Sequence, residues 1–79
     1  ETDTMTYQGE TFTSTWKEED YGIIQPEDQR TIIVGTHRYG SRAASMFYKN
    51  ENPTETTIIH WEDDNGDQKV QWSEVNKVE

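Results

Sequence analysis

The chain has 79 residues, of which 29% are hydrophobic, and a formal net charge of −9 at pH 7. This length predicts a single domain over residues 1–79, with fraying expected at residues 1–3 and 76–79. The charge argues against non-specific binding to nucleic acid or anionic lipid, since both are themselves negative. The absence of cysteine excludes a disulfide framework and a thiolate metal site.

The composition favours strands over helices. The chain has no leucine but six isoleucines, four valines and eleven threonines, and β-branched side chains suit a pleated surface. Gln8-Gly9 predicts a first hairpin between residues 4–7 and 10–16, followed by a charged loop at 17–20. Residues 22–25 and 30–36 predict two further strands, joined through a turn that Pro26 begins.

Residues 41–50 fit two structures. As a helix, Ser41 is the N-cap, Ala43, Met46 and Phe47 form one face, and Asn50 ends it. As a strand, alternate side chains point to opposite faces, and this is the interpretation we prefer. Pro53 then interrupts any ladder within a turn at residues 50–55.

The dipeptide Asn65-Gly66 suits the positive φ angles of a type I′ turn and predicts a second hairpin. The two-residue loop fixes a register that separates apolar from polar side chains. The apolar face holds Ile59, Trp61, Val70 and Trp72, and the polar face holds His60, Glu62, Lys69 and Gln71. We expect the two tryptophans to lie diagonally across the hairpin, within reach of each other.

These elements predict an all-β fold: a small, single-domain, SH3-like barrel of about 5–7 short antiparallel strands. The alternative is an α+β fold with one short helix near residues 41–50. No apolar run exceeds Ile32-Ile33-Val34, so we expect no membrane span or signal peptide in the chain as given. A domain this small without disulfides leans towards an intracellular location, cytoplasmic or nuclear.

The sequence gives no catalytic constellation, so we predict that the protein is not an enzyme. His37 and Ser41 are four residues apart, but no third group can be nominated to orient the base. The carboxylates at 18–20 and 62–64 fall in predicted surface loops, where solvated charge explains them better than an acid/base pair does.

A second pattern at the predicted hairpin concerns metal binding. Six residues fall at positions 1, 3, 5, 7, 9 and 12 of a calcium-loop spacing: Asp63, Asn65, Asp67, Lys69, Gln71 and Glu74. That loop needs glycine at position 6, whereas Gly66 stands at position 4, and the flanking segments alternate as strands. We therefore prefer the hairpin and predict no metal and no cofactor. Loose Ca²⁺ binding between Asp64 and Asp67 stays open, and two histidines 23 residues apart do not support zinc.

Residues 35–42 form the most suggestive surface segment. Arg38 and Arg42 with Tyr39 could grip a phosphate or a base, although the acidic charge elsewhere argues against nucleic acid. Residues 29–50 contain no acid at all, which indicates either an internal strand neutralised by its neighbours or a local cationic spot. If Trp61 or Trp72 is partly exposed near Tyr39 or Tyr48, the aromatics would form a ligand pocket; otherwise they are core.

The predicted hairpin resembles the end of small SH3-like barrels of the Tudor type. Ile58-Ile59-His60-Trp61-Glu62-Asp63-Asp64-Asn65-Gly66, then Val70, Trp72 and residues 73–78, look like their strand, acidic turn, strand and closing segment. Arg42-Ala43-Ala44 adds to the likeness, which covers about the last 40 residues. It implies a barrel fold and, for such domains, an aromatic cage for methylated Lys or Arg. Trp61, Tyr39 and Tyr48 are candidates for that cage.

The leading hypothesis is a non-catalytic protein-interaction module whose acidic surface binds a basic protein or peptide. One alternative is a small acidic inhibitor that mimics DNA towards a nucleic-acid-binding enzyme. The other is a nucleic-acid- or carbohydrate-binding module that uses exposed aromatics. The candidate ligand-binding residues are Trp61, Trp72, Tyr39, Tyr48, Arg38 and Arg42.

Overall fold

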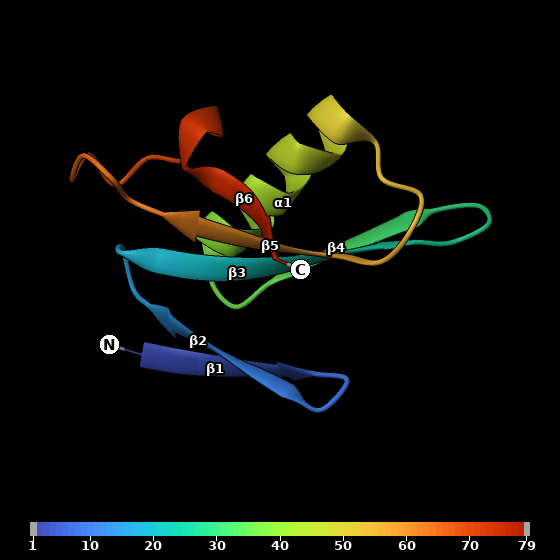
Figure 1. Ribbon diagram of the computed structural model, residues 1–79, viewed down its shortest axis with the longest axis horizontal. Helices are drawn as coiled ribbons and strands as arrows, with labels where there is room; N and C mark the ends of the chain where they lie inside the picture. Colours follow the sequence, from blue (N-terminus) through green and yellow to red (C-terminus); the bar gives the residue numbers. More distant parts are fainter. Residues whose placement is uncertain (1, 79) are drawn as a thin grey trace.

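A computed structural model describes residues 2–78. In chain order, the elements are β1 (Thr2–Tyr7), β2 (Glu10–Thr15), β3 (Glu19–Pro26), β4 (Thr31–Gly35), α1 (Arg38–Glu51), β5 (Thr57–Glu62), a 3₁₀ helix η1 (Trp72–Glu74) and β6 (Val75–Val78). The prediction of a small antiparallel β-rich domain is confirmed, with the one helix that the α+β alternative contains (Figure 1).

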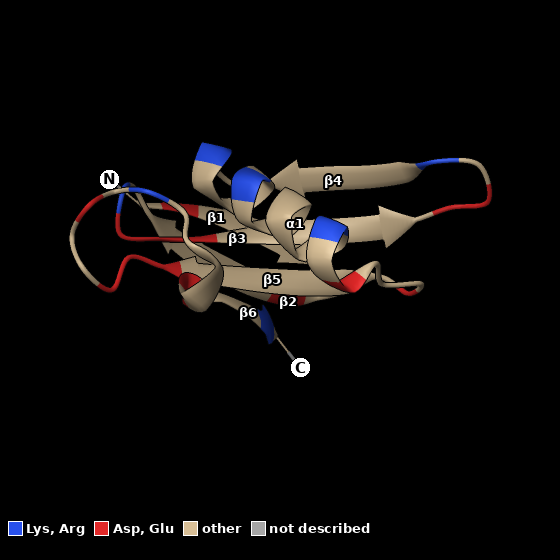
Figure 2. Ribbon diagram, turned by 90° about the horizontal axis from the view of Figure 1, so that it is seen from above, with Lys and Arg blue, Asp and Glu red and all other residues tan. Residues whose placement is uncertain are grey.

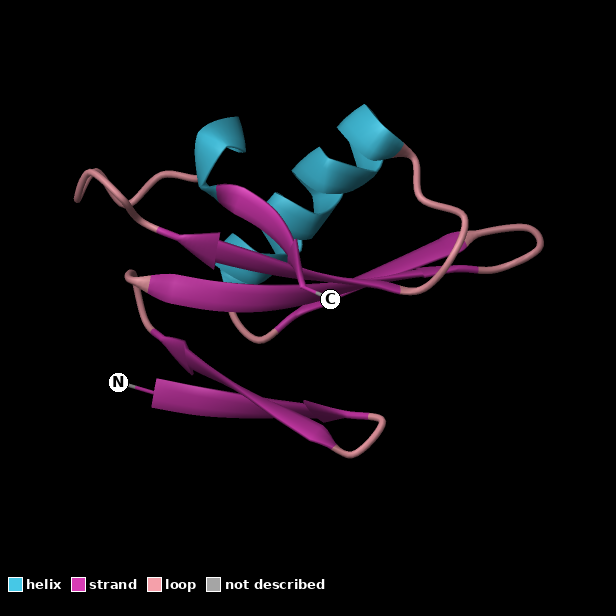
Figure 3. Cartoon of the chain, in the orientation of Figure 1, coloured by secondary structure: helices cyan, strands magenta, loops and turns pink. Residues whose placement is uncertain are grey.

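The six strands form one antiparallel sheet that stays open. Its order is β1-β2-β3-β5-β6, and β4 pairs with β3 beside this path. The helix covers one side of β3, β4 and β5, while the β1–β2 hairpin lies on the other side (Figure 3). The expected closure into a barrel is therefore absent among residues 2–78, and a helix takes the place of a second sheet layer.

The turn between β1 and β2 confirms the first predicted hairpin. Gln8 and Gly9 both have positive φ, 52° and 82°, and Tyr7 pairs with Glu10 across the two-residue loop. The pair that joins this hairpin to β3 is Thr15 with Glu19. Between them the chain makes a tight turn in which Lys17 has φ 68°. This turn is shorter than the charged loop predicted at residues 17–20.

The preferred strand at residues 41–50 was wrong, and the helix alternative is confirmed. No β-branched residue occurs between Thr36 and Thr54, and alanine, arginine, methionine and lysine favour helix in this stretch. The helix begins earlier than predicted, with His37 at the N-cap instead of Ser41. Its last residue is Glu51, and the C-cap is Asn52 rather than Asn50. Asn52 has φ 47°, and its N–H donates to the Tyr48 carbonyl oxygen just before Pro53.

The second predicted hairpin is wrong. β5 forms as expected, but residues 63–71 make a loop, and the strand that pairs with β5 is β6. A two-residue loop at Asn65-Gly66 would place Trp61 opposite Val70, but Trp61 lies opposite Val75. Gly66 has the expected positive φ, 77°. Gln68 also has positive φ, 58°, although it lies outside the two-residue turn that was predicted, so the chain makes a wider loop.

The core lies between α1 and the sheet. Ile24, Ile59 and Trp61 are fully buried and meet Ala43 and Ala44 on the helix. Residues 2–3 and 76–78, where fraying was expected, pair within β1 and β6, and Glu1 and Glu79 lie outside the described residues. The chain thus places the start of α1, the start of β3 and the end of β5 at one end of the molecule.

Candidate functional site

The segment between β5 and β6 is organised by carboxylate and amide side chains that accept hydrogen bonds from the backbone. Asp63 Oδ1 accepts from the N–H of Gly66 at 3.1 Å, and its Oδ2 accepts from the N–H of Gln68 at 2.9 Å. Asn65 Oδ1 accepts from the N–H of Asp67 at 3.1 Å. These side chains replace the backbone pairing that a hairpin would supply.

The far half of the loop continues the same pattern. Asp67 Oδ1 accepts from the N–H of Lys69 at 3.0 Å, and its Oδ2 accepts from Gln71 Nε2 at 2.6 Å. The chain then enters η1, whose capping box joins Gln71 and Glu74 reciprocally. The loop is therefore held by its own polar side chains from residue 63 to residue 74.

Glu74 is the buried anchor of this loop. Its side chain is 2% exposed, and Oε1 accepts from Trp61 Nε1 at 3.2 Å and from the Gln71 N–H at 3.1 Å. Its Oε2 accepts from the Asp64 N–H at 2.9 Å. One carboxylate thus ties β5, the start of the loop and η1 together.

Three carboxylates converge inside the loop. One oxygen from each of Asp63, Asp67 and Glu74 lies within 4.8 Å of the others. These residues stand at positions 1, 5 and 12 of the calcium-loop spacing. Gln68 stands at position 6, where that loop uses glycine for a sharp turn, and it adopts the left-handed conformation that glycine would supply. The backbone at position 6 therefore has the conformation that a calcium loop requires, although the residue there is not glycine.

The structure also changes which aspartates belong together. The sequence left loose binding open between Asp64 and Asp67, but the cluster contains Asp63 instead. Asp64 is exposed, and its contribution to the loop is a backbone N–H. An oxygen-only donor set with several carboxylates suits a hard cation such as Ca²⁺.

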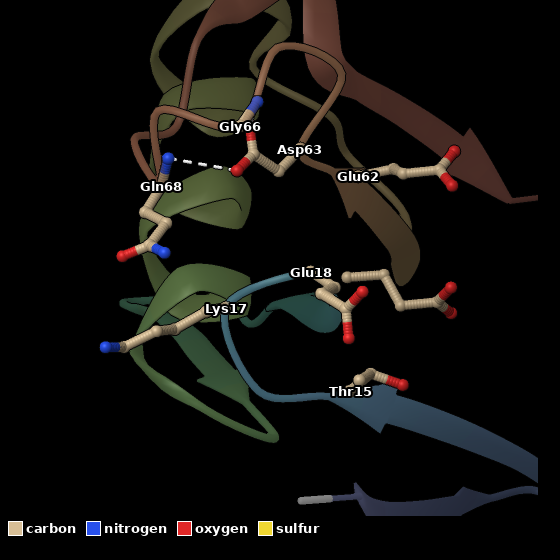
Figure 4. A pocket seen from close by; sticks show the side chains of 8 residues that line it. Thr15, Lys17, Glu18, Glu62, Asp63, Gly66 and Gln68 are labelled. Atoms are coloured by element: carbon tan, nitrogen blue, oxygen red, sulfur yellow. Dashed lines mark hydrogen bonds between the residues drawn. The ribbon is translucent and has the colours of Figure 1, made fainter.

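A second acidic feature adjoins this loop. An open cavity of about 350 Å³ lies between the β2–β3 turn and the end of β5. It is lined by Thr15, Lys17, Glu18, Glu19, Glu62, Asp63, Gly66 and Gln68. The Asp63 N–H donates to the Glu18 carbonyl oxygen at 2.9 Å, which joins the two segments that line it. Lys17 points away from the carboxylates of Glu18 and Glu62 (Figure 4), so it does not neutralise them at the cavity.

Like charges face each other at this cavity. Glu19 and Glu62 are direct partners across β3 and β5, and like charges opposite each other are unfavourable. The His60 imidazole lies beside this pair, with Nε2 3.7 Å from Glu19 Oε1. Burial, and then the charges of Glu19 and Glu62, raise the pKa of Tyr21, which lies two residues along β3 from Glu19. Figure 2 shows acidic residues gathered in the loops at this end of the molecule.

The predicted aromatic site residues do not gather around one pocket. Trp61 is fully buried and stacks on Tyr39, with ring centroids 4.7 Å apart. Trp72 is 44% exposed on η1, and its ring centroid lies 6.0 Å from that of Phe47. Tyr48 is half-buried, and its hydroxyl accepts from Thr31. Trp61 and Tyr39 are therefore core residues, and the expected tryptophan pair is wrong.

Arg38 packs on aromatic rings, and Gly40 in the same segment lets α1 pack closely on β3. Arg38 and Arg42 are both exposed on α1, and the Arg38 guanidinium lies over the rings of Trp16 and Tyr39, 5.2 and 5.3 Å from their centroids. Gly40 has a packing role, because a Cβ there would come within 2.0 Å of the Tyr21 carbonyl oxygen. Close packing of α1 on β3, rather than a phosphate loop, accounts for this glycine.

Asp20 is the residue that sequence reasoning missed. It is fully buried, and its carboxylate accepts from the N–H groups of Tyr21, His37 and Gly40, the last at 2.7 Å. It occupies the N-terminus of α1, where His37 makes no side-chain cap. The available signal was that His37 is a poor N-cap residue, so another side chain must accept from the first N–H groups of α1. The sequence does not show which residue supplies that side chain.

Comparison with protein families, with curated proteins and with solved structures gave no match to this chain. The resemblance to Tudor-type barrels therefore stays a prediction, although the strand–turn–strand that suggested it does not form and Arg42-Ala43-Ala44 is helical. Neither helix within residues 2–78 has the length and apolarity needed to span a membrane.

Proposed function

We propose that this chain is a non-catalytic binding domain whose 63–74 loop holds a Ca²⁺ ion. The observation that carries the proposal is the convergence of Asp63, Asp67 and Glu74 at the spacing of a calcium loop. Three carboxylates within 4.8 Å of one another repel, and a divalent cation between them would replace that repulsion by attraction. An ion there would link the end of β5 to η1 and so fix the strand β6 that follows.

Thermal or urea unfolding with and without Ca²⁺ tests the proposal. An ion that binds only the folded state raises the free energy of unfolding by about 2.7 kcal/mol at a hundredfold excess over its Kd. Asp67→Asn should abolish most of this increase, because it removes a charged ligand from the cluster. Mg²⁺ at the same concentration should stabilise less, since it prefers a smaller, octahedral site and keeps its waters.

Asp64→Asn is the matched control. It makes the same charge change three residues away, on a side chain outside the cluster. Binding of Ca²⁺ with equal loss in both variants would mean diffuse attraction to an acidic surface. No heat of binding and no stabilisation in the unmodified chain would overturn the proposal.

A second candidate function is the binding of a basic protein partner at the adjacent acidic cavity. The specific observation in its favour is the opposed pair Glu19 and Glu62, with Glu18 and Asp63 on the same cavity. A lysine or arginine side chain placed there would relieve the repulsion between them. This extends the interaction-module hypothesis to the surface formed by Glu18, Glu19, Glu62 and Asp63.

Titration with a lysine-rich peptide tests this second candidate. Binding should weaken as salt is raised, and Glu62→Gln should weaken it about twofold to fivefold, the range of an exposed charge pair. Glu55→Gln removes one exposed charge from the loop before β5 and should leave affinity unchanged. Equal effects of the two substitutions would mean that net charge alone attracts the peptide.

A further inference from the structure

β4 forms an open edge of the sheet. Within residues 2–78, β3 is the one strand that pairs with it, through the register from Pro26–Thr31 to Gly22–Gly35. Figure 2 shows β4 along one margin of the molecule with β3 beside it. The backbone N–H and C=O groups of its outer edge are thus available to another strand.

This edge lacks the features that usually prevent strand addition. Residues 31–35, Thr-Ile-Ile-Val-Gly, contain neither a charge nor a proline. The other outer strands each carry a charge, Asp3 in β1 and Lys77 in β6. Val34 is 47% exposed, one of two large hydrophobic side chains so exposed among the residues that the structure describes. β4 is therefore the edge best suited to pairing.

The strand is also complementary to itself. If two copies align antiparallel about Ile33, Ile32 of each copy lies opposite Val34 of the other, on the face away from α1. Val34 already continues a row across the sheet through Ile23 and Ile58 to Val78. Pairing would extend this aliphatic row into the second copy and cover the exposed Val34 side chain.

The charges near β4 suit a second copy as the occupant. Two chains of net charge −9 repel in most orientations, but residues 29–50 contain no acid, so this edge is where repulsion is weakest. In the antiparallel arrangement, the β3–β4 loop with Glu27 and Asp28 lies beside the other copy where β4 leads into α1 and Arg38. Both acids and Arg38 are exposed, and the contact would occur twice by symmetry.

We propose that two copies of this chain associate through β4 into one continuous antiparallel sheet. Sedimentation equilibrium or light scattering of the full chain over a range of concentrations tests this. The unmodified chain should convert from monomer to dimer as concentration rises. Val34→Lys, which places a charge on a side chain that is exposed in the monomer, should raise the dimer Kd at least about tenfold.

Thr4→Lys is the matched control, because it puts the same charge on an exposed side chain of the β1 edge. It should leave the dimer Kd unchanged, and circular dichroism of both variants shows that each is folded. Protection of the β4 amides from hydrogen exchange should increase with protein concentration. A monomer at every concentration would overturn the proposal, as would a dimer that Thr4→Lys dissociates and Val34→Lys does not.

Discussion

Asp20 does for α1 what no residue of the helix does for itself. The buried carboxylate accepts three backbone N–H groups, two of which come from His37 and Gly40 at the helix start. A negative charge at this end also meets the positive end of the helix dipole. The acid that looked like part of a solvated loop is thus the joint between β3 and α1.

Replacing Asp20 by alanine should lower the free energy of unfolding by roughly 3 kcal/mol or more, because buried N–H groups are left without acceptors. Asp20→Asn keeps one acceptor oxygen and should cost less. Glu18→Ala, at an exposed acid two residues earlier, should change stability by less than about 0.5 kcal/mol. Urea unfolding measures all three, and a similar destabilisation by Glu18→Ala would contradict this role of Asp20.

Tyr21 gives the protein a dependence on alkaline pH. Burial and the neighbouring Glu19 and Glu62 raise its pKa in the folded state above the ordinary 10.0. The unfolded chain therefore releases this proton at lower pH than the folded chain does. The stabilising contribution is complete below pH 10 and is lost as pH rises through the folded pKa.

The measurement is the free energy of unfolding from neutral pH to well above pH 10. Stability should fall over the alkaline range in the unmodified chain, and Tyr21→Phe should show a shallower fall. Tyr7→Phe removes a phenol from β1 and should keep the full slope. Identical slopes in the unmodified chain and Tyr21→Phe would contradict the effect.

At the scale of elements, the 63–74 loop carries one local strain. Gln68 holds φ 58°, a conformation that costs a residue with a Cβ about 1–2 kcal/mol. Gln68→Gly should raise the free energy of unfolding by about 0.5–1 kcal/mol, after the extra chain entropy of glycine is subtracted. Gln68→Ala keeps the Cβ and should bring no gain. A gain of the same size in both variants would mean that the side chain, not the backbone, is strained.

Turns whose geometry depends on adjacent residues were predictable from the sequence. Gln8-Gly9 indicated the right hairpin because positive φ is a local property. The hairpin of β3 and β4 was also placed correctly, although Pro26 is itself the last residue of β3 and pairs with Thr31 rather than beginning the turn. Asn65-Gly66 carries the same local signal, but there the side chains of Asp63 and Asp67 hold the backbone in a wider loop. A dipeptide cannot show that side chains will take over the pairing.

The start of the helix was harder to predict than its middle, because the reason for it is tertiary. Gly40 looks like a helix breaker in the sequence, yet its missing Cβ is what lets α1 approach β3. The sequence shows the calcium-loop spacing at residues 63–74, but glycine at position 4 rather than position 6 favours a hairpin over a calcium loop. Whether Gln68 would adopt left-handed φ depended on the loop around it. The sequence therefore indicates which residues could form the candidate site, but it does not show that their carboxylates converge.

At the scale of the whole molecule, the β1–β2 hairpin is attached less firmly than the rest. Its strands pair fully with each other, but its backbone link to the sheet is the pair Thr15 and Glu19. Side chains supply the other contacts, among them Phe12 on Tyr21 with ring centroids 5.1 Å apart, and Asp3 with His37 at 2.6 Å. Few hydrogen bonds need to break for the hairpin to separate from β3.

We therefore expect two levels of local stability. Native-state hydrogen exchange should show amides of residues 2–15 opening with a lower free energy than those of β3 and β5. Asp3→Asn should lower the protection of the hairpin and leave that of β5 unchanged, because the Asp3 carboxylate joins β1 to His37 at the start of α1. Equal protection of all strands would indicate that the molecule opens only as one unit.

The bond from the Trp61 indole to Glu74 has an optical consequence. The fluorescence of an indole depends on the strength of the hydrogen bond that it donates. The Trp61 indole donates to Glu74, and Glu74 also belongs to the carboxylate cluster with Asp63 and Asp67. Occupation of the loop would draw electron density from Glu74, and the emission of a fully buried chromophore would change without any added dye. The protein would then report the state of its own loop by its ultraviolet fluorescence.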